Sequence, residues 1–411
     1  MKKKLTISIS ALILLIFGIY LFNYNKKDVI TFSNTVDNDR IAIYLVNENG
    51  IATLSNSNVF PTEGYTFNSE RSICENGTYI EWNDRDKSLS LVGDIKDSCK
   101  VYFDVYVPTF ADTIIELAST NNHIYHHTSD TTAADYVANN AGDDSYRYSG
   151  PSSTVNDNYV CFGYDINNYT NECESGTFSA SSDYAYRIIG VFKDVDGGSD
   201  DAYYVKLIKA AAYIGGGSTV AWNSSNSNTF SASPLFSTDL NGTGSGYLYT
   251  LNTNGWTSYL AQAIWNVGGC KAANCSDGTA KTAYTGEMVT SGSNSYGAYG
   301  TSVTNNTYKI GLMYVNDYAY ATTSNYWTTA LNTYNSAAAV QDWLYVPGLG
   351  DEWTTSRHST SESYIYDVRA DGHVDTIYAN FSYVVRPVLY LASNVKATGT
   401  GTTTDPYVLS M

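Results

Sequence analysis

The residues best suited to chemistry lie in the acidic turn Asp194–Asp201. This turn holds four carboxylates around two glycines, and three of them, Asp194, Asp196 and Asp200, are spaced along it. Carboxylate oxygens on a tight turn are ligands that Ca2+ prefers. The turn lacks the terminal Glu of an EF-hand loop, so a solvated hairpin tip is the competing interpretation. The three aspartates are therefore our candidate calcium ligands, and we expect no other cofactor.

A second candidate site is the aromatic and polar segment 358–380. Its residues Tyr364, Tyr366 and Tyr378 are interleaved with Asp, Asn and Ser. Aromatic faces stack on ligand rings while short polar side chains adapt their hydrogen bonds, and together they make a general binding surface. We expect these three tyrosines to contact a ligand. Four tryptophans belong either to this surface or to the core, with the last two the first candidates for burial: Trp222, Trp327, Trp343 and Trp353.

No catalytic constellation stands out from the background of the sequence. His123 and His127 would share a face with Glu116 if the helix predicted before them continued, as ligands of Zn2+ or Ni2+ do. No H-E-x-x-H pattern accompanies them, which favours an exposed polar helix end. No G-x-S-x-G pattern brackets a serine. We therefore predict no catalytic residues and a protein that is not an enzyme.

Composition and the N-terminal residues indicate an exported protein. The formal charge of −17 over 411 residues repels phosphate backbones, so nucleic acid is not an expected partner. Lys2, Lys3 and Lys4 precede the uncharged apolar run Leu5–Phe22, which is at the lower length limit for a membrane-spanning helix. No small-x-small cleavage site follows it. We expect residues 1–27 to be a single-pass signal anchor in the cell membrane, with the C-terminal ectodomain outside the cell.

The six cysteines are even in number and all follow the expected anchor. An oxidising compartment favours disulfides over free thiols. No C-x-x-C pattern or finger-spaced histidine accompanies them, which disfavours zinc. Six cysteines allow many connectivities, and proximity in the sequence suggests three local bridges. These are Cys74 with Cys99, Cys161 with Cys173, and Cys270 with Cys275.

Strand patterns and turn residues divide the chain after the anchor into three parts. Residues 28–107 are predicted to form a small all-β module, because partly alternating runs such as Arg40–Val46 are separated by turn signals. Thr109 predicts a capped helix in a helical linker over residues 108–139. Residues 140–411 are expected to form a larger, loop-rich domain.

The larger domain is predicted around a hairpin and one core strand. Tyr184–Phe192 and Ala202–Lys209 are β-rich runs on either side of the acidic turn. Tyr383–Leu391 is an apolar run typical of a buried strand, and Arg386-Pro387 in its middle should break the ladder there. We expect Arg386 to brace a loop carbonyl or carboxylate.

Between these strands the pattern predicts one helix and several long connections. Trp256, Leu260, Ile264 and Val267 recur at helical spacing before two glycines. Segments 215–253 and 276–306 are rich in Ser, Asn, Gly and Thr and are expected to be long loops.

Five segments of the larger domain occur in an order that is specific when taken together: Tyr186–Phe192, Val205–Lys209, Lys309–Tyr320, Asp351–Arg357 and Val385–Tyr390. Together they resemble a family of membrane-anchored surface proteins of low-GC Gram-positive bacteria that carries a domain of unknown function, DUF6273. The resemblance covers roughly residues 140–411 and implies neither an activity nor a ligand. A Trp-Thr-Thr-Ser segment followed by an Arg-containing core strand is also similar to domains of C-type-lectin-like fold, which the resemblance therefore implies here.

These observations predict a β-rich α+β surface protein with an N-terminal anchor helix, a small disulfide-stapled β module and a C-terminal, loop-rich C-type-lectin-like domain. The expected function is adhesion, that is, non-catalytic recognition of an extracellular glycan or protein. A structural envelope protein without a specific ligand is the first alternative, and an extracellular hydrolase is the second. A buried histidine or carboxylate with a shifted pKa in a deep cleft would favour the hydrolase.

Overall fold

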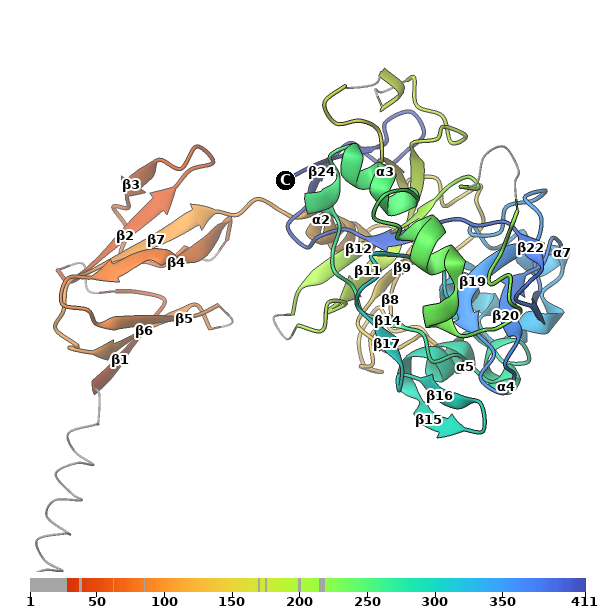
Figure 1. Ribbon diagram of the computed structural model, residues 1–411. Coiled ribbons are helices and arrows are strands. Elements are labelled where there is room, and N and C mark those ends of the chain that lie inside the picture. The colour runs from red at the N-terminus through yellow and green to blue at the C-terminus, as the bar shows by residue number, and fades with distance from the viewer. Residues whose placement is uncertain are drawn as a thin grey trace, which may run out of the picture. The chain divides into compact units, whose positions relative to one another are not determined.

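The computed structural model describes residues 28–36, 39–61, 63–84, 86–168, 171–173, 176–198, 201–213 and 219–411 (Figure 1). The chain is β-rich and divides into two compact units, one ending at Val107 and one spanning Pro108–Met411. The boundary thus falls at the end of the predicted β module. The predicted anchor lies outside the described residues, and none of the helices within them has the length and apolar character needed to cross a membrane.

The first unit consists of two small sheets that share an apolar core, and their strands pair antiparallel except for the parallel pair β2–β7. One sheet has the order β3-β2-β7-β4 and the other the order β1-β6-β5. Alternating residues such as Leu89, Leu91, Val101 and Phe103 are buried between them, as half-buried strands require. The strands are β1 Asp28–Ser33, β2 Ile41–Val46, β3 Ala52–Leu54, β4 Tyr65–Cys74, β5 Tyr79–Asn83, β6 Ser88–Gly93 and β7 Cys99–Val105.

A mixed sheet runs through the second unit in the order β18-β23-β12-β11-β10-β25-β24, with β9 pairing both β11 and β8. The predicted hairpin is confirmed as β11–β12. Nearly all residues of its two strands are buried, because both faces of the sheet are covered. The strands are β8 Ile124–His126, β9 Tyr146–Tyr148, β10 Tyr159–Cys161, β11 Ala185–Lys193, β12 Tyr203–Lys209, β18 Ile310–Gly311, β23 Val388–Tyr390, β24 Lys396–Thr398 and β25 Tyr407–Ser410.

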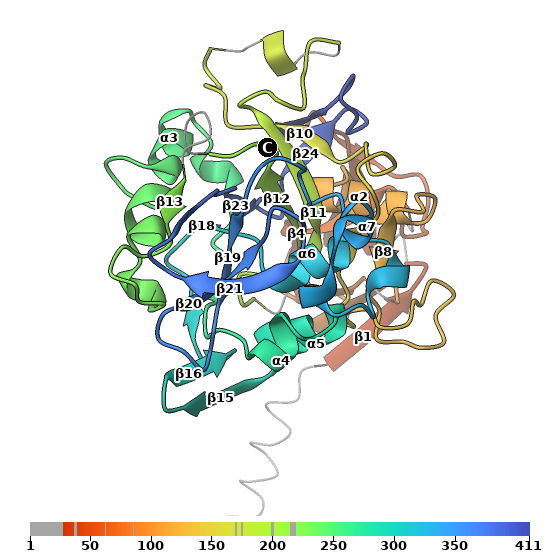
Figure 2. The same cartoon turned by 90° about the vertical axis from the view of Figure 1, so that its right-hand side faces the viewer.

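Smaller sheets and short helices surround this sheet, and in Figure 2 helices α4 and α5 lie beside the hairpin β15–β16. The small sheets pair β13 Val220–Ala221 with β22 Ser382–Tyr383, β14 Trp265–Asn266 with β17 Thr304–Asn305, β15 Ser291–Asn294 with β16 Gly297–Gly300, and join β19 Glu352–Arg357, β20 Tyr364–Val368 and β21 Val374–Tyr378. The α-helices are α2 Phe110–Ala118, α3 Tyr247–Thr253, α4 Ala272–Cys275, α5 Ala280–Tyr284, α6 Val315–Ala321 and α7 Ser336–Ala339. Shorter turns are η1 Asn171–Cys173, η2 Phe230–Ala232, η4 Thr257–Tyr259, η6 Ser324–Tyr326 and η7 Leu331–Thr333, while η3 Leu235–Leu240 and η5 Thr285–Val289 are π-helical.

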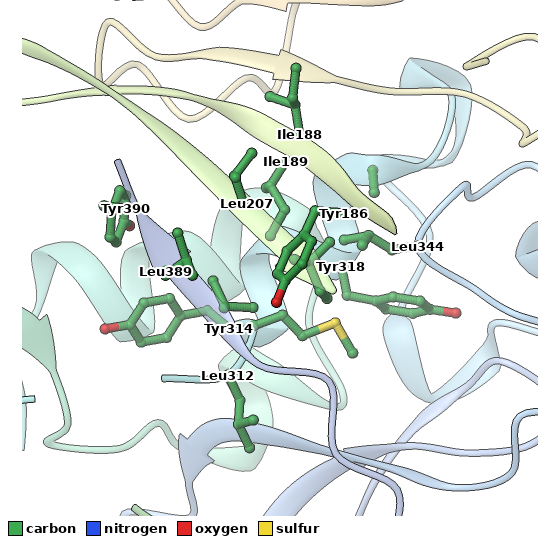
Figure 3. Close-up of a cluster of buried hydrophobic side chains, with 14 of the residues drawn as sticks. Tyr186, Ile188, Ile189, Leu207, Leu312, Tyr314, Tyr318, Leu344, Leu389 and Tyr390 are labelled. Carbon is green, nitrogen blue, oxygen red and sulfur yellow. The ribbon is translucent and has the colours of Figure 1, made fainter. Parts of the chain in front are cut away.

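The core of the second unit forms where the central strands meet α6. Figure 3 shows Leu207 of β12 close to Leu389 of β23, and both are fully buried, as is Ile188 of β11. The break predicted in the core strand is confirmed, since β22 ends at Tyr383 and β23 begins only after Pro387.

Helix α2 belongs to the second unit rather than to a linker. Thr109 caps it as predicted, with its hydroxyl accepting from the backbone N–H of Asp112 at 3.2 Å. The apolar face with Phe110, Ala111 and Ile114 is buried against the central sheet. The segment predicted as a helical linker therefore begins with a core element.

The prediction of a helix over Trp256–Val267 is wrong. Only the single 3-10 turn η4 forms, and the chain then runs extended: the N–H of Ala261 donates to the carbonyl of Tyr390, and Trp265 pairs with Asn305. Trp256, Leu260 and Val267 are buried as their pattern implied, whereas Ile264 is 36% exposed. Strand pairing takes the backbone hydrogen bonds that a helix would have used. The two predicted long loops are also wrong in part, because they contain η3 and α3, and α5, η5 and β15–β16.

Candidate functional site

The acidic turn is the tip of the β11–β12 hairpin. Asp196 there accepts hydrogen bonds from the N–H of Gly198 at 3.0 Å and from the hydroxyl of Tyr204 at 2.7 Å. Asp194 has a positive φ of 49° and a buried Oδ1 without a hydrogen-bond partner in the described structure. Asp200 lies outside the described residues. Within the described part of the chain no three His, Cys, Asp or Glu side chains group as metal ligands, and calcium at this tip stays a prediction.

The three candidate tyrosines do not form one exposed surface. Tyr364 and Tyr378 face each other across β20 and β21 with ring centroids 4.8 Å apart, and Tyr378 is 43% exposed. Tyr366 is fully buried, and its hydroxyl donates to the carbonyl of Cys270 at 3.2 Å. The prediction that Tyr366 contacts a ligand is therefore wrong. The physical reason is that β20 is the middle strand of its sheet, and the Tyr366 side chain faces inward beneath the Cys270–Cys275 segment.

The aromatic residues expected to divide between surface and core fall almost entirely in the core. Trp222, Trp327, Trp343 and Trp353 are at most 1% exposed, which confirms the predicted burial of the last two and places the first two with them. Arg386 is buried as well. Its Nε and Nη2 donate to the Glu352 carboxylate at 2.7 and 2.8 Å, and Nη2 also donates to the carbonyl of Leu344, which confirms its predicted bracing role.

A polar cavity opens beside the acidic hairpin tip and is here called the hairpin pocket. Its volume is about 320 Å³. Residues from β9, β11, β12, η5 and α6 and from the chain around them line it. The charged and amide side chains that matter below are Asp143, Arg147, Lys193, Lys206, Asn266 and Asp317, and the aromatic ones are Phe192, Tyr284, Tyr314 and Tyr390.

The floor of the hairpin pocket holds a buried ion pair. Lys206 Nζ lies 2.5 Å from Asp317 Oδ2, and each side chain is 1% exposed. Burial lowers the pKa of Lys206, and the Asp317 carboxylate opposes that shift. Aromatic faces surround the ammonium group, with the ring centroids of Tyr314 and Phe192 at 4.9 and 5.2 Å. Asp317 also accepts from the N–H of Tyr314, which caps α6 and fixes the carboxylate.

A second ion pair forms one wall of the hairpin pocket. Arg147 Nη2 lies 2.6 Å from Asp143 Oδ2, while Nη1 donates to Asn316 Oδ1 at 2.9 Å. Burial alone would raise the pKa of Asp143, but the neighbouring Arg147 outweighs it and the pKa lies below its ordinary value. The Arg147 guanidinium also lies over the rings of Phe192 and Tyr320. The wall is thus charged and fixed in place.

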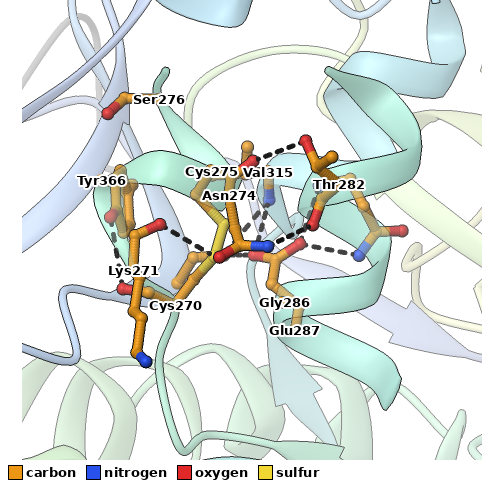
Figure 4. Close-up of a disulfide and its surroundings, with 12 residues drawn as sticks. Cys270, Lys271, Asn274, Cys275, Ser276, Thr282, Gly286, Glu287, Val315 and Tyr366 are labelled. Atoms are coloured by element: carbon orange, nitrogen blue, oxygen red, sulfur yellow. Dashed lines mark hydrogen bonds between the residues drawn. A yellow bond between two sulfur atoms is a disulfide. The ribbon is translucent and has the colours of Figure 1, made fainter. Parts of the chain in front are cut away.

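Behind the hairpin pocket, Glu287 of the π-helical turn η5 anchors the start of α6 (Figure 4). Its carboxylate accepts from the N–H groups of Val315 and Asn316, from Asn316 Nδ2 and from the Ser356 hydroxyl. Burial raises its pKa to about 6 although these donors favour the ionised form. All of these donors are protein groups of α6 and β19. The raised pKa of Glu287 is therefore that of a carboxylate with a structural role.

Three disulfides stabilise the two units, and they join the pairs that sequence proximity suggested. Cys74–Cys99 links β4 to β7 in the first unit, and Cys161–Cys173 links β10 to η1. Cys270–Cys275 closes the short loop that precedes α5 and η5 (Figure 4). The last bridge holds the segment that carries Tyr284 and Met288 into the hairpin pocket.

Sequence reasoning missed most of the hairpin pocket. Arg147 and Asn316 are in hydrogen-bond contact although 169 positions separate them, and no local pattern links such residues. One signal was present: Lys206 interrupts the apolar run Val205–Ile208, and a lysine there must find a buried partner.

Comparison with family models, curated proteins and solved structures gave no match for this chain.

Proposed function

We propose that the second unit recognises an extracellular glycan at the hairpin pocket without catalysing a reaction on it. In this proposal the predicted anchor, residues 1–27, holds the protein at the cell surface as a single-pass membrane protein, and the C-type-lectin-like architecture expected from the resemblance supplies the scaffold. A protein ligand for the same pocket is the broader form of the proposal.

The observation that supports a glycan is the balance of charge in the hairpin pocket. Among its described lining residues Asp143, Asp194 and Asp317 offset Arg147, Lys193 and Lys206. A cavity with equal numbers of fixed acids and bases favours a neutral ligand over an ion. The carboxylates accept hydrogen bonds and the cations and amides donate them, which suits a molecule that carries many hydroxyl groups.

Aromatic side chains supply the second requirement for binding a sugar ring. Phe192, Tyr284 and Tyr390 line the hairpin pocket together with the aliphatic side chains of Ile264 and Met288. Such surfaces cover the apolar face of a pyranose while the polar groups orient it. This replaces the exposed tyrosine surface of 358–380 as the place where aromatic residues meet a ligand.

The hydrolase alternative would need an acid or base with a shifted pKa inside the cleft. The carboxylates whose pKa burial raises most clearly, Glu287, Asp342 and Asp367, do not line the hairpin pocket. Glu287 is occupied by scaffold donors, and Asp367 of β20 pairs with Arg369, which follows that strand. The binding proposal uses the lining groups only as fixed hydrogen-bond partners.

The test is a binding screen of the purified full chain against glycans and envelope polymers, with calcium and with chelator. Tyr284→Phe and Asn266→Ala remove one polar group each from the hairpin pocket and should weaken a saturable interaction by about tenfold, the value of one hydrogen bond. Tyr378→Ala, at the exposed end of β21, is the matched control and should leave affinity unchanged. Loss of binding in Tyr378→Ala alone would return the site to segment 358–380, and absence of binding would favour the structural alternative.

A further inference from the structure

A second cavity of about 390 Å³ contains a single charged side chain, that of Arg357, and is here called the Arg357 pocket. It lies between the turn around η2, the hairpin β15–β16 and residues 303–308. Its described lining includes Phe230, Tyr296 and Tyr308 together with several hydroxyl groups, and no acidic residue belongs to it.

Arg357 is held in place by the backbone and has no acidic partner. Its Nε donates to the carbonyl of Val267 at 2.8 Å and its Nη2 to the carbonyl of Ala298 at 2.6 Å. These two bonds use two of the five N–H donors of the guanidinium. In the described part of the chain no carboxylate lies within ion-pair distance, and the Nη1 donors have no hydrogen-bond partner. Burial lowers the pKa of Arg357 with no neighbouring acid to oppose it.

An unpaired, half-buried arginine is costly because burial removes water from the guanidinium and no acid takes its place. Lys206 and Arg386, also buried in the second unit, each have an acid at hand, Asp317 and Glu352. Arg187 is buried without an ion-pair partner in the described structure, but all three of its guanidinium nitrogens donate to protein oxygens. The guanidinium of Arg357 instead adjoins open space lined by donors, acceptors and aromatic rings. A ligand that brings a negative charge supplies what the fold does not.

We propose that the Arg357 pocket binds the carboxylate of an acidic saccharide, such as a uronic acid residue. The planar guanidinium fork matches a carboxylate of one negative charge, whereas a doubly charged phosphate would find only one cation. Thr229, Ser231 and Thr307 offer hydroxyl groups to the sugar, and Phe230 and Tyr308 offer ring faces.

This site is separate from the hairpin pocket. Asn266 lines the hairpin pocket and the next residue, Val267, lines the Arg357 pocket. Val267 continues the extended chain of β14, since its N–H donates to the carbonyl of Val303. Successive residues of an extended chain point to opposite faces, so Asn266 and Val267 face different cavities. The proposal for Arg357 therefore does not depend on the one for the hairpin pocket.

The test is calorimetric titration of the purified full chain with a galacturonate oligosaccharide, the matched neutral galactose oligosaccharide and inorganic phosphate. We expect saturable binding of the galacturonate probe that depends on the Arg357 pocket, whereas any binding of the neutral sugar should be unchanged by substitutions in that pocket. Phosphate binding as tight as that of galacturonate would overturn the assignment to a saccharide carboxylate and identify a free-anion site. Absence of galacturonate binding would overturn the proposal itself.

Tyr296 provides a variant that leaves Arg357 and its backbone contacts intact. Its side chain is 45% exposed and lines the Arg357 pocket from the turn between β15 and β16. Tyr296→Glu places a negative charge there and should weaken galacturonate binding on the order of tenfold or more, while the neutral Tyr296→Gln should retain most of it. Equal affinities in the two variants would contradict the proposal. Tyr284→Phe, in the hairpin pocket, should leave galacturonate binding unchanged, which separates the two sites.

Discussion

Lys206 Nζ lies 2.5 Å from Asp317 Oδ2 in the interior of the second unit, and the two residues come from β12 and α6. Removing both charges from water costs several kcal/mol per ion, and the attraction between them only partly repays this. A pair of apolar residues would fill the same space with less loss.

Lys206→Met should destabilise the second unit by about 3 to 5 kcal/mol, because it leaves the Asp317 carboxylate buried without its partner. The double variant Lys206→Met/Asp317→Asn keeps an oxygen for the cap of α6 and removes the stranded charge, so it should recover at least half of that loss. Denaturant unfolding of each variant measures the coupling. Lys193→Met, which breaks a solvent-exposed pair with Asp201, should cost much less than Lys206→Met. Equal losses in the single and double variants would show that the stranded Asp317 charge is not what destabilises Lys206→Met.

Gly190 is required by the close approach of β9 to β11. A Cβ at this position would overlap the carbonyl oxygen of Tyr146 and lie 3.1 Å from the Cα of Arg147. Gly190→Ala should therefore destabilise the protein by about 2 kcal/mol or more, and it should weaken binding at the hairpin pocket because Arg147 moves with β9. Thermal unfolding measures the first effect. Gly244→Ala is the control, since its Cβ would meet nothing within 4 Å, and a similar loss there would remove the steric explanation.

Substitutions of Tyr366 and Tyr378 test whether the first ring is buried and the second exposed in segment 358–380. Tyr366→Ala deletes a fully buried ring and should cost about 3 to 5 kcal/mol. Tyr378→Ala removes only a cross-strand contact with Tyr364 and should cost less than about 1 kcal/mol. Chemical denaturation followed by tryptophan fluorescence gives both values. Similar losses of stability for the two substitutions would contradict the burial of the Tyr366 ring on the inward face of β20.

The parts of this fold that the sequence predicts are those fixed by neighbouring residues. The β11–β12 hairpin follows from two β-rich runs flanking an acidic glycine turn, and the start of α2 follows from Thr109 and Asp112 three positions apart. The disulfide pairs also join cysteines that are near in the chain.

The parts that sequence reasoning missed depend on contacts between distant segments. The run Trp256–Val267 has helical spacing, but partners at Leu391 and Asn305 draw it into extended pairing. Tyr366 and Tyr378 have the same local composition, and only their strand positions separate a buried ring from an exposed one. Both cavities are likewise assembled from segments whose proximity no local pattern encodes.

The disulfide Cys74–Cys99 should stabilise the first unit alone. Cys74→Ala/Cys99→Ala opens a loop with a sequence separation of 25, which in the chain-entropy description costs roughly 3 to 4 kcal/mol. Because the chain forms two compact units, we expect calorimetry to show one transition shifted to lower temperature and the other unchanged. Cys270→Ala/Cys275→Ala, with a separation of 5, should cost less and shift the transition of the second unit. A shift of both transitions by either pair would show that the units unfold together.

Glu287 should make the second unit more stable as the pH falls. Burial raises the pKa of Glu287 from 4.5 to about 6, so between these values the folded protein holds a proton that the unfolded chain releases. The free energy of unfolding should therefore decrease by about 2 kcal/mol as the pH rises from 4.5 to above 6. Glu287→Gln cannot titrate, and the difference in unfolding free energy between variant and wild type should change by that amount across this window.

Ser356 gives an internal check on the same group. Its hydroxyl donates to the Glu287 carboxylate and lowers the pKa that burial has raised. Ser356→Ala should raise the pKa of Glu287 further and move the upper end of the stability window to higher pH. Urea unfolding at closely spaced pH values between 4 and 8 measures both profiles. A difference between wild type and Glu287→Gln that does not vary with pH would show that the pKa of Glu287 is the same in the folded and unfolded states, so that the scaffold donors cancel the effect of burial.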